Sequence, residues 1–239
     1  MSLSNIRIVL VRTFHPGNIG SAARSMKTMG LNSLHLVNPK EFPSPEANKM
    51  AAGALDVLEN ARVYDSLEEA IAECTVVVAC TARPRGYDLP TLLPAEAAVS
   101  LNSAAQSSPV AVIFGPERMG LHNDDIRLAK YRLTIPANPD YSSLNMAAAV
   151  QTLSYEIFKT AQTVTAPIAP MRDLPSSENM ERLYSHLETV LKEISFLRPH
   201  QGETMQRIRQ LVTRAEPDNL ELNILRGILS AIERYAKKD

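Results

Sequence analysis

Residues 112–149, VIFGPERMGLHNDDIRLAKYRLTIPANPDYSSLNMAAA, decide the fold of this chain. The segment reads as a short apolar strand, a glycine loop, a short helix, a second strand, a polar turn and a helix. If the two strands pair in one sheet, both loops lie side by side at its edge, where open α/β sheets bind ligands. We therefore predict a ligand site that is built from these two loops.

Each of the two loops has its own chemistry. In the first, Gly115 and Gly120 bracket the segment PERM, so the backbone turns sharply and can approach a ligand closely. In the second, two prolines stiffen the turn, and Ser142 or Ser143 is predicted to cap the helix that follows. Taken alone, each loop is explained equally well as an ordinary turn.

Two nucleotide-binding motifs are excluded by inspection. The spacing of Gly115 and Gly120 matches a P-loop, but Leu121 and His122 stand where Lys and Ser or Thr are required. After the first strand the chain offers only GxxG, and the next strand ends in Asn38 where an acidic ribose ligand is needed. A nicotinamide-dependent oxidoreductase, one rival class, therefore lacks its fingerprint.

Strand candidates alternate with helical segments over the first two thirds of the chain, which predicts an α/β domain with a mostly parallel sheet over residues 1–161. A proline-containing linker is expected at 162–175, and three amphipathic helices at 176–239. The six strand candidates are 6–11, 34–38, 61–64, 75–80, 109–114 and 131–135.

Composition limits the choice of partners and compartment. The 239 residues carry 25 Lys and Arg against 26 Asp and Glu, so nucleic-acid binding requires local patches. Two cysteines provide no zinc site and favour a reducing compartment. No signal-peptide pattern and no stretch of membrane-spanning length occurs, so we expect a cytoplasmic protein with no metal and no membrane association.

Several arginines are candidates for contacts with phosphate. Arg24 lies in the helix after the first strand, Arg83 and Arg85 lie in the loop after residue 80, and the last third has its own cluster. The alternative for each is a solvated surface residue. The cluster in the last third comprises Arg198, Arg207, Arg209 and Arg214.

Three motifs carry a resemblance to a known family. The segments NIGSAAR (18–24), FGPERMGL (114–121) and IPANPDYSSLN (135–145) resemble the three motifs of the SPOUT class of S-adenosylmethionine-dependent RNA methyltransferases. The similarity extends through IRIVLVR, MKTMGL and ELNILRGIL, so it covers most of the chain and reaches the family of tRNA (cytidine/uridine-2′-O)-methyltransferases. Jointly the motifs are highly specific, and each one alone is moderately so.

The resemblance implies properties that the residue patterns do not supply. It implies a homodimer with active sites shared across the interface, a C-terminal trefoil knot in the α/β domain, and S-adenosyl-L-methionine as the methyl donor. The implied substrate is tRNA, methylated on the ribose of cytidine or uridine at position 32 of the anticodon loop. A different RNA site is the alternative, and a non-catalytic RNA-binding protein is a weaker one.

The resemblance also assigns roles to individual residues. Arg24, Asn18 and Ser143 are placed at the chemistry, with Arg24 acting across the dimer. The family's cofactor pocket corresponds to Cys80, Thr81, Ala82, Gly115, Glu117, Gly120, Ile135, Ser142, Ser143, Leu144 and Asn145. The residues expected to contact tRNA are Arg24, Arg83, Arg85, Arg207, Arg209 and Arg214.

Chemistry limits what Arg24 does. A guanidinium with a pKa above about 12 is a poor base, so we expect Arg24 to orient the ribose or phosphate and to stabilise the developing alkoxide. A strongly perturbed Arg24 that acts as the base is the alternative. Arg12, Phe14 and Pro16 flank the first motif, and the sequence assigns them no role.

Overall fold

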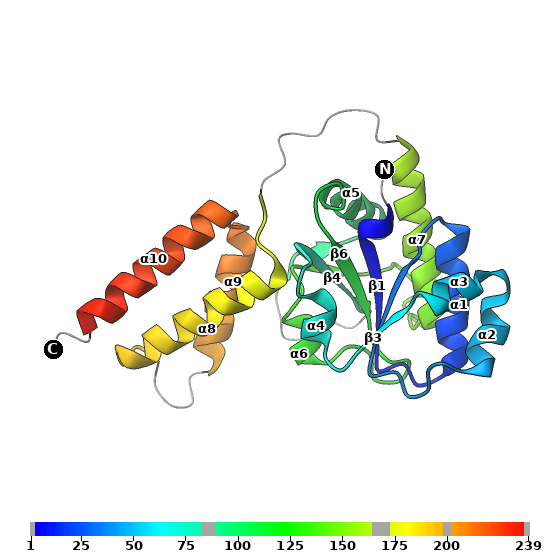
Figure 1. Ribbon diagram of the computed structural model, residues 1–239, viewed down its shortest axis with the longest axis horizontal. Coiled ribbons are helices and arrows are strands. Elements are labelled where there is room, and N and C mark those ends of the chain that lie inside the picture. Colours follow the sequence, from blue (N-terminus) through cyan, green and yellow to red (C-terminus); the bar gives the residue numbers. More distant parts are fainter. Residues whose placement is uncertain (1–2, 83–88, 164–172, 198–201, 237–239) are drawn as a thin grey trace. The chain divides into compact units, whose positions relative to one another are not determined.

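The computed structural model describes residues 3–82, 89–163, 173–197 and 202–236 (Figure 1). The chain divides into two compact units, Met1–Ala169 and Pro170–Asp239. The predicted linker at 162–175 falls mostly on 164–172, which lies outside the described residues.

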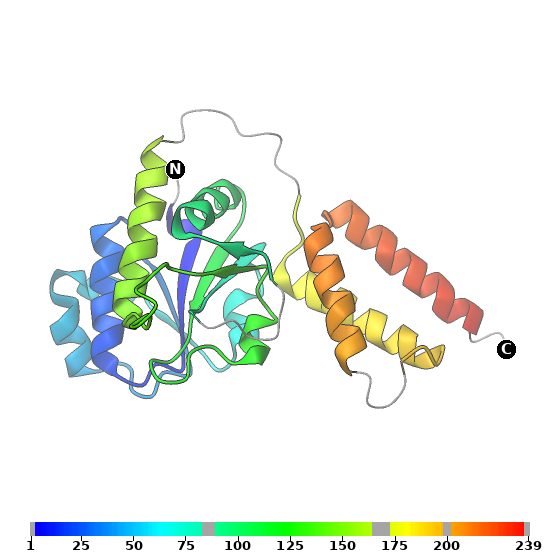
Figure 2. The ribbon, with the colours of Figure 1, turned by 180° about the vertical axis from the view of Figure 1, so that it is seen from behind.

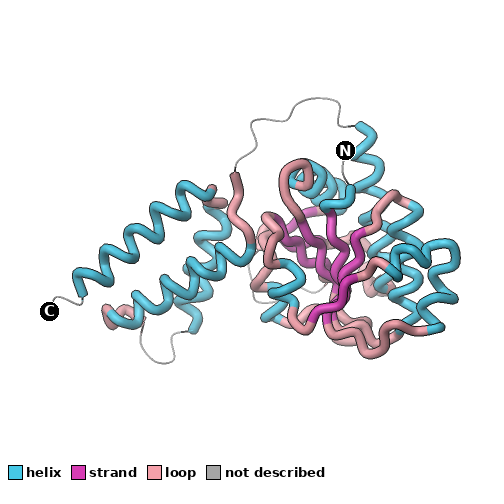
Figure 3. The backbone as a smooth tube through the Cα atoms, viewed as in Figure 1, coloured by secondary structure: helices cyan, strands magenta, loops and turns pink. Residues whose placement is uncertain are grey.

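The first unit is built on a parallel sheet of seven strands in the order β3-β2-β1-β6-β4-β7-β5, drawn in magenta in Figure 3. All six predicted strands are confirmed, with ends shifted by up to two residues. The sheet also contains β5, which the sequence analysis missed because it is only two residues long. The strands are β1 Ile6–Val11, β2 Ser33–Val37, β3 Arg62–Tyr64, β4 Val76–Cys80, β5 Thr91–Leu92, β6 Val110–Phe114 and β7 Tyr131–Leu133.

Helices cover both faces of this sheet (Figures 1 and 2). Helix α7 packs against both α1 and α5 on one face, and residues of α4 and α6 join the core on the other. The helical elements of the first unit are η1 Leu3–Asn5, α1 Pro16–Thr28, α2 Pro45–Ala51, η2 Ala52–Ala54, α3 Leu55–Glu59, α4 Leu67–Ile71, α5 Pro94–Ala104, α6 Asn123–Ile126 and α7 Met146–Thr163.

Burial on both faces explains the sequence of the central strands. Every residue of β1 and of β6 is buried, and such strands read as continuous apolar runs because neither face meets water. Val9 and Val11 of β1 pack on the face that carries α4. The knot that the resemblance implies stays a prediction.

The segment 44–54 differs from the single helix that its composition predicts. Helix α2 ends at Ala51, because Ala52 adopts φ of +51°, a conformation that no α-helix tolerates. A 3₁₀ turn and then α3 follow. By contrast, the helix predicted to end at Gly30 does so: α1 ends at Thr28 and Gly30 takes φ of +74° just after it.

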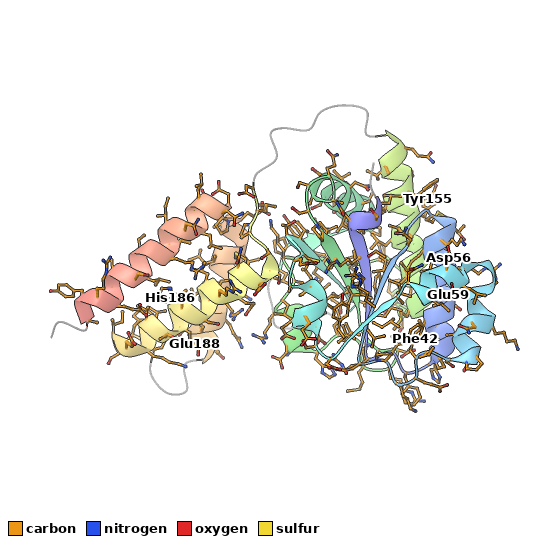
Figure 4. All side chains as sticks on the ribbon, viewed as in Figure 1. Phe42, Asp56, Glu59, Tyr155, His186 and Glu188 are labelled. Atoms are coloured by element: carbon orange, nitrogen blue, oxygen red, sulfur yellow. The ribbon has the colours of Figure 1, made fainter. Side chains whose placement is uncertain are left out.

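The second unit consists, in its described residues, of three helices: α8 Ser177–Glu193, α9 Gly202–Ala215 and α10 Asn219–Ala236. Its small core joins α8 to α10 through Leu183, Val190, Leu222 and Leu229. His186, labelled in Figure 4, faces Glu233 across these helices at 3.4 Å. Along the described residues, none of the helices of either unit combines the length and apolarity that crossing a membrane requires.

Candidate functional site

The strand order brings three loops together at the carboxyl edge of the sheet. Strand β4 lies between β6 and β7, with Cys80 opposite Phe114 on one side and Leu133 on the other. The loops that leave these three strands therefore start next to one another. In a parallel sheet, this edge is where ligands bind.

A pocket opens between these three loops. It brings together nearly all the residues that the resemblance assigns to the cofactor, although they come from separate parts of the chain. Its lining consists of Cys80, Thr81, Ala82, Phe114, Gly115, Pro116, Glu117, Arg118, Gly120, Ile135, Ser142, Ser143, Leu144, Met146 and Ala149. Asn145 is the member of the predicted set outside this lining, and the residues of the lining absent from that set are Phe114, Pro116, Arg118, Met146 and Ala149.

Gly115 allows the glycine loop to close on itself. A Cβ atom at this position would lie 2.2 Å from the backbone nitrogen of Leu121 and 2.4 Å from the carbonyl carbon of Gly120. Gly120 adopts φ of +65°, and its N–H donates to the carbonyl of Pro116 at 2.8 Å. The loop therefore forms a compact ring that any side chain at 115 would force open.

Glu117 ties this loop to the turn after β1. Its carboxylate accepts hydrogen bonds from the N–H groups of Phe14 at 3.1 Å and His15 at 3.2 Å, and from Nδ2 of Asn18 at 2.7 Å. Burial raises the pKa of Glu117, but these hydrogen bonds outweigh it and the net pKa lies below its usual value. The ionised carboxylate thus joins the first motif to the second.

Asn18 extends the network to the third motif. Its Oδ1 accepts a hydrogen bond from Nδ2 of Asn145 at 3.1 Å. The Oδ1 of Asn145 in turn accepts from the N–H of Ala147 at 2.8 Å, at the start of α7. Asn145 therefore caps α7, and the prediction of Ser142 or Ser143 as the cap was wrong, because the helix begins later than its composition suggests.

Because neither Ser142 nor Ser143 caps α7, both serines are exposed and line the pocket. The turn that holds them is fixed at its start by Thr134, whose Oγ1 donates to the carbonyl of Thr81 at 3.4 Å. Thr81 itself donates its N–H to the carbonyl of Leu133 at 3.0 Å. Adjacent strand ends thus hold the hydroxyl-rich loop over the pocket.

Cys80 contributes an apolar wall. Burial raises the pKa of its thiol to about 12, so the group stays protonated at neutral pH. A thiol without thiolate character is a poor nucleophile. The pocket therefore offers backbone groups, hydroxyls, the Glu117 carboxylate and the Arg118 guanidinium.

Arg24 does not line the pocket of its own chain. It lies exposed on α1, one and a half turns after Asn18. Its carbonyl accepts a hydrogen bond from Oγ1 of Thr28. The structure of one chain thus brings Asn18, Glu117 and Asn145 together and leaves Arg24 apart, and its role stays a prediction.

The arginines predicted to contact RNA fall into three groups. Arg83 and Arg85 lie outside the described residues, and Arg207 and Arg214 are exposed on α9. Arg209 is engaged internally: its two terminal nitrogens donate to the Glu181 carboxylate at 2.7 and 2.9 Å.

The surroundings of Arg209 leave it little freedom. Its guanidinium carbon lies 4.4 Å from the centre of the Tyr184 ring, and 16% of its side chain is exposed. A bidentate pair with a carboxylate in this position stabilises the contact between α8 and α9. The geometry therefore favours a structural role for Arg209 over the RNA contact expected from the sequence.

Comparison with known proteins identifies the family. A model of the SpoU rRNA methylase family matches residues 5–155, and a model of the C-terminal domain of tRNA methyltransferase TrmJ matches residues 178–239. The chain is 49% identical over 241 residues to tRNA (cytidine/uridine-2′-O-)-methyltransferase TrmJ of Yersinia enterocolitica, which spans 98% of this chain and 94% of that protein. It is also 49% identical over 238 residues to TrmJ of Cronobacter sakazakii, with 97% of each chain covered.

A solved structure agrees with these relatives over both units. The crystal structure of TrmJ from Z. mobilis ZM4 superimposes with a TM-score of 0.83 at 37% identity, covering 95% of this chain and 98% of that one. The resemblance drawn from the three motifs is thus confirmed. The chain belongs to the SpoU methylase family of SPOUT RNA methyltransferases, within its group of TrmJ tRNA 2′-O-methyltransferases.

Proposed function

We propose that this protein transfers a methyl group from S-adenosyl-L-methionine to the ribose 2′-hydroxyl of cytidine or uridine at position 32 of the tRNA anticodon loop, in the cytoplasm. The observation that carries the proposal is the three-loop pocket at the carboxyl edge of the sheet. Its lining holds residues of the second and third motifs, and Asn18 of the first motif is hydrogen-bonded to Glu117 and Asn145.

The lining of the pocket fits this donor. Strand ends supply backbone N–H and C=O groups next to small side chains, which suits the polar edges of a nucleoside. Gly115 removes the side chain that would stop a ligand from reaching the loop backbone. The donor supplies an electrophilic methyl carbon on a sulfonium, whose bond to sulfur breaks as the bond to the ribose oxygen forms.

The residues of the chain then have two tasks. Methyl transfer is an in-line displacement, so much of the acceleration comes from holding the hydroxyl oxygen in line with the methyl group. Ser143 and Asn145 stand at the mouth as hydrogen-bonding groups for the ribose. Arg24 orients the ribose or its phosphate and stabilises the negative charge that develops as the hydroxyl proton leaves.

Arg24 is exposed and does not line the pocket of its own chain, so we propose that it serves the pocket of a partner subunit in a homodimer. Mixing two inactive variants tests this arrangement. At a donor concentration near the wild-type dissociation constant, Arg24→Ala and Gly115→Ala are each expected to be nearly inactive, whereas a dimer with one copy of each retains one intact composite site. Methyl transfer that appears only after subunits have exchanged supports the shared site. A mixture that stays inactive contradicts it.

The reaction is tested by transfer of labelled methyl to unmodified tRNA, followed by nucleoside analysis. We expect label in 2′-O-methylcytidine or 2′-O-methyluridine, and none when position 32 carries a 2′-deoxynucleotide. Arg24→Ala should abolish transfer with donor affinity intact, and Arg24→Lys should remain strongly impaired because an ammonium lacks the bidentate geometry. Label on a base, or full acceptance of the deoxy substrate, would overturn the proposal.

The exposed arginines of α9 and the loop containing Arg83 and Arg85 are proposed to assist tRNA binding by contacting its backbone. Arg207→Ala and Arg214→Ala should each weaken binding and reduce the salt dependence of the tRNA dissociation constant by about one unit of slope. Arg209→Ala should leave that slope unchanged and instead lower stability, because its guanidinium is already paired. Equal changes of slope for all three would contradict this division.

A further inference from the structure

Phe14 is an aromatic side chain left exposed beside the candidate pocket. It lies in the turn between β1 and α1, and 43% of it is exposed. Its backbone is fixed: its N–H and that of His15 both donate to Glu117, a residue that lines the pocket. The backbone that carries the ring is therefore held by the same carboxylate that joins the motifs.

Two cations accompany the ring. The Nζ of Lys40 lies 3.5 Å from the ring centre, and the guanidinium carbon of Arg118 lies 5.8 Å from it. Arg118 also lines the pocket, and the N–H of Lys40 donates to the carbonyl of Thr13 next to Phe14. Within the described residues, neither cation forms a salt bridge with a carboxylate.

An exposed ring with two cations close to it matches the chemistry of an unpaired nucleotide. Proteins hold single-stranded RNA by stacking its bases on aromatic side chains and by pairing its phosphates with Lys or Arg. An apolar protein partner would instead favour a ring without unpaired charges around it, since charged groups are depleted from the centres of protein interfaces. The surroundings of Phe14 thus favour RNA.

We propose that Phe14 is a stacking platform for an unpaired base of the tRNA, next to the nucleotide whose ribose is methylated. Lys40 and Arg118 contact the phosphates that flank this base. The proposal rests on the proposed function and deepens it, because it adds a substrate-binding surface to the mouth of the pocket. It also gives the first turn a role that its sequence alone does not reveal.

The chain contains a matched control. Tyr155 on α7 is 50% exposed, and Nζ of Lys159 lies 5.7 Å from its ring centre. It is similar in exposure to Phe14 and also has a cation beside its ring, although Lys159 is paired with Glu156, and it lies nine residues along the helix from Met146 of the pocket lining (Figure 4). Loss of this ring should leave tRNA methylation unchanged.

The first experiment compares four full-length proteins at saturating S-adenosyl-L-methionine. We expect Phe14→Leu, which keeps an apolar side chain but no π face, to lower kcat/KM for tRNA about tenfold. Phe14→Trp should retain wild-type efficiency, and Tyr155→Leu should do the same. Donor affinity, measured without tRNA, should be equal in all four, which separates loss of stacking from a disturbed pocket.

The second experiment identifies the base. Transcripts with an abasic site at one or the other neighbour of the methylated nucleotide are tested against wild type and Phe14→Leu. At the stacked position, removal of the base should lower wild-type efficiency about tenfold and leave Phe14→Leu unchanged. The platform would be overturned if the losses from the abasic site and from Phe14→Leu added at both neighbouring positions. It would also be overturned if kcat/KM of Phe14→Leu for tRNA lay within twofold of wild type.

Direct tRNA binding without donor keeps the two proposals distinguishable. If wild type binds tRNA but transfers no methyl, the proposed function fails, and the platform is still judged by an expected loss in affinity of about tenfold in Phe14→Leu. If wild type methylates tRNA and Phe14→Leu binds and reacts normally, the function stands and the platform is refuted. That result would leave the ring available to a protein partner.

Discussion

The two edges of the one sheet carry polar residues for opposite purposes. At the carboxyl edge, Glu117, Asn18 and Asn145 bond to one another across three loops around a pocket whose wall includes exposed serines. At the amino edge, a second and larger hollow is lined by Arg7, His35 and other polar residues. Size and polarity alone would favour the amino edge as the functional site.

The partners of the amino-edge residues point to stability instead. Arg7 donates to the carbonyl of Ala70 at 3.0 Å and pairs with Glu73, so it joins β1 to α4. His35 is 3% exposed and stacks on the Tyr64 ring at 5.4 Å. We expect changes at the carboxyl edge to reduce binding and catalysis at constant stability. Changes at the amino edge should instead reduce stability and leave binding and catalysis constant.

The largest effect is expected for Gly115→Ala at the carboxyl edge. The new methyl group meets two backbone atoms that cannot move independently, so the loop must open. An opened loop no longer presents its backbone to the donor, so we expect a loss in donor affinity of roughly 100-fold. Calorimetric titration with S-adenosyl-L-methionine measures it.

Gly53→Ala is the control for that substitution, since a Cβ atom there meets nothing within 4 Å. It should leave both donor affinity and thermal stability unchanged. Donor binding by Gly115→Ala within threefold of wild type would mean that the glycine loop does not touch the donor. The assignment of the carboxyl edge to donor binding would then lose its main support.

The next effect is a dependence of stability on pH at the amino edge. Burial, with the charges of Arg7 and Arg62, lowers the pKa of His35 from 6.5 to about 4. Above pH 6.5 the imidazole is neutral in both states and contributes no pH dependence. Below it only the unfolded chain binds the proton, so stability falls by about 1.4 kcal/mol per pH unit down to about pH 4.

Comparison of wild type with His35→Phe isolates this contribution from that of the carboxylates. Between pH 7.5 and pH 5, the free energy of unfolding of wild type should drop by about 2 kcal/mol more than that of the variant. Urea unfolding at both pH values measures the difference, and methyl transfer at pH 7.5 should be equal. Parallel curves for the two proteins would show that His35 titrates normally.

The sequence predicts the central strands well because both of their faces are covered. An apolar run as in β1 then has a single interpretation, whereas the two residues of β5 provide no pattern to detect. The loops meet where the alternation of strands and helices places them. Local patterns and simple topology thus suffice for the sheet and for the location of the pocket.

The sequence alone does not reveal hydrogen-bond and ion-pair partners that are distant along the chain. Glu117 accepts from residues about 100 positions away, and Arg209 pairs with Glu181 on another helix. Neither contact has a local signature, so Arg209 was assigned to RNA, and Glu117 was assigned to the cofactor pocket without its bonds to the first motif. Asn145 was missed as a cap because hydroxyl and amide caps compete within a few residues.

Glu117→Gln should give a smaller, functional loss. The amide keeps the shape but removes the negative charge that accepts three hydrogen bonds. Hydrogen bonds to a charged group are worth about 1.5–3 kcal/mol, and a partial loss spread over the loops should lower kcat/KM for tRNA about tenfold. Steady-state kinetics measures it, and the melting temperature should change little.

The matched control is Glu59→Gln on α3, an exposed glutamate that is labelled in Figure 4. It should show wild-type kinetics. If Glu117→Gln instead lowered the melting temperature with kcat/KM intact, the carboxylate would serve the fold, as the polar groups of the amino edge do. The two edges would then no longer differ in kind.

The smallest effect is expected for Glu73→Gln, and it tests whether the amino edge is more than a set of surface ion pairs. Arg7 holds the pKa of Glu73 below its usual value, but the glutamate side chain is 71% exposed and that of Arg7 only 10%. Solvent screens such a pair, so its removal should cost about 1 kcal/mol, most of it from leaving a buried guanidinium with fewer partners. Asp56→Asn, which removes the exposed pair with Lys27, should have no measurable effect in the same urea unfolding experiment. Equal free energies of unfolding for the two variants would mean that burial of Arg7 does not strengthen its ion pair. A larger loss of stability for Glu73→Gln at constant methyl transfer would assign the amino edge to stability.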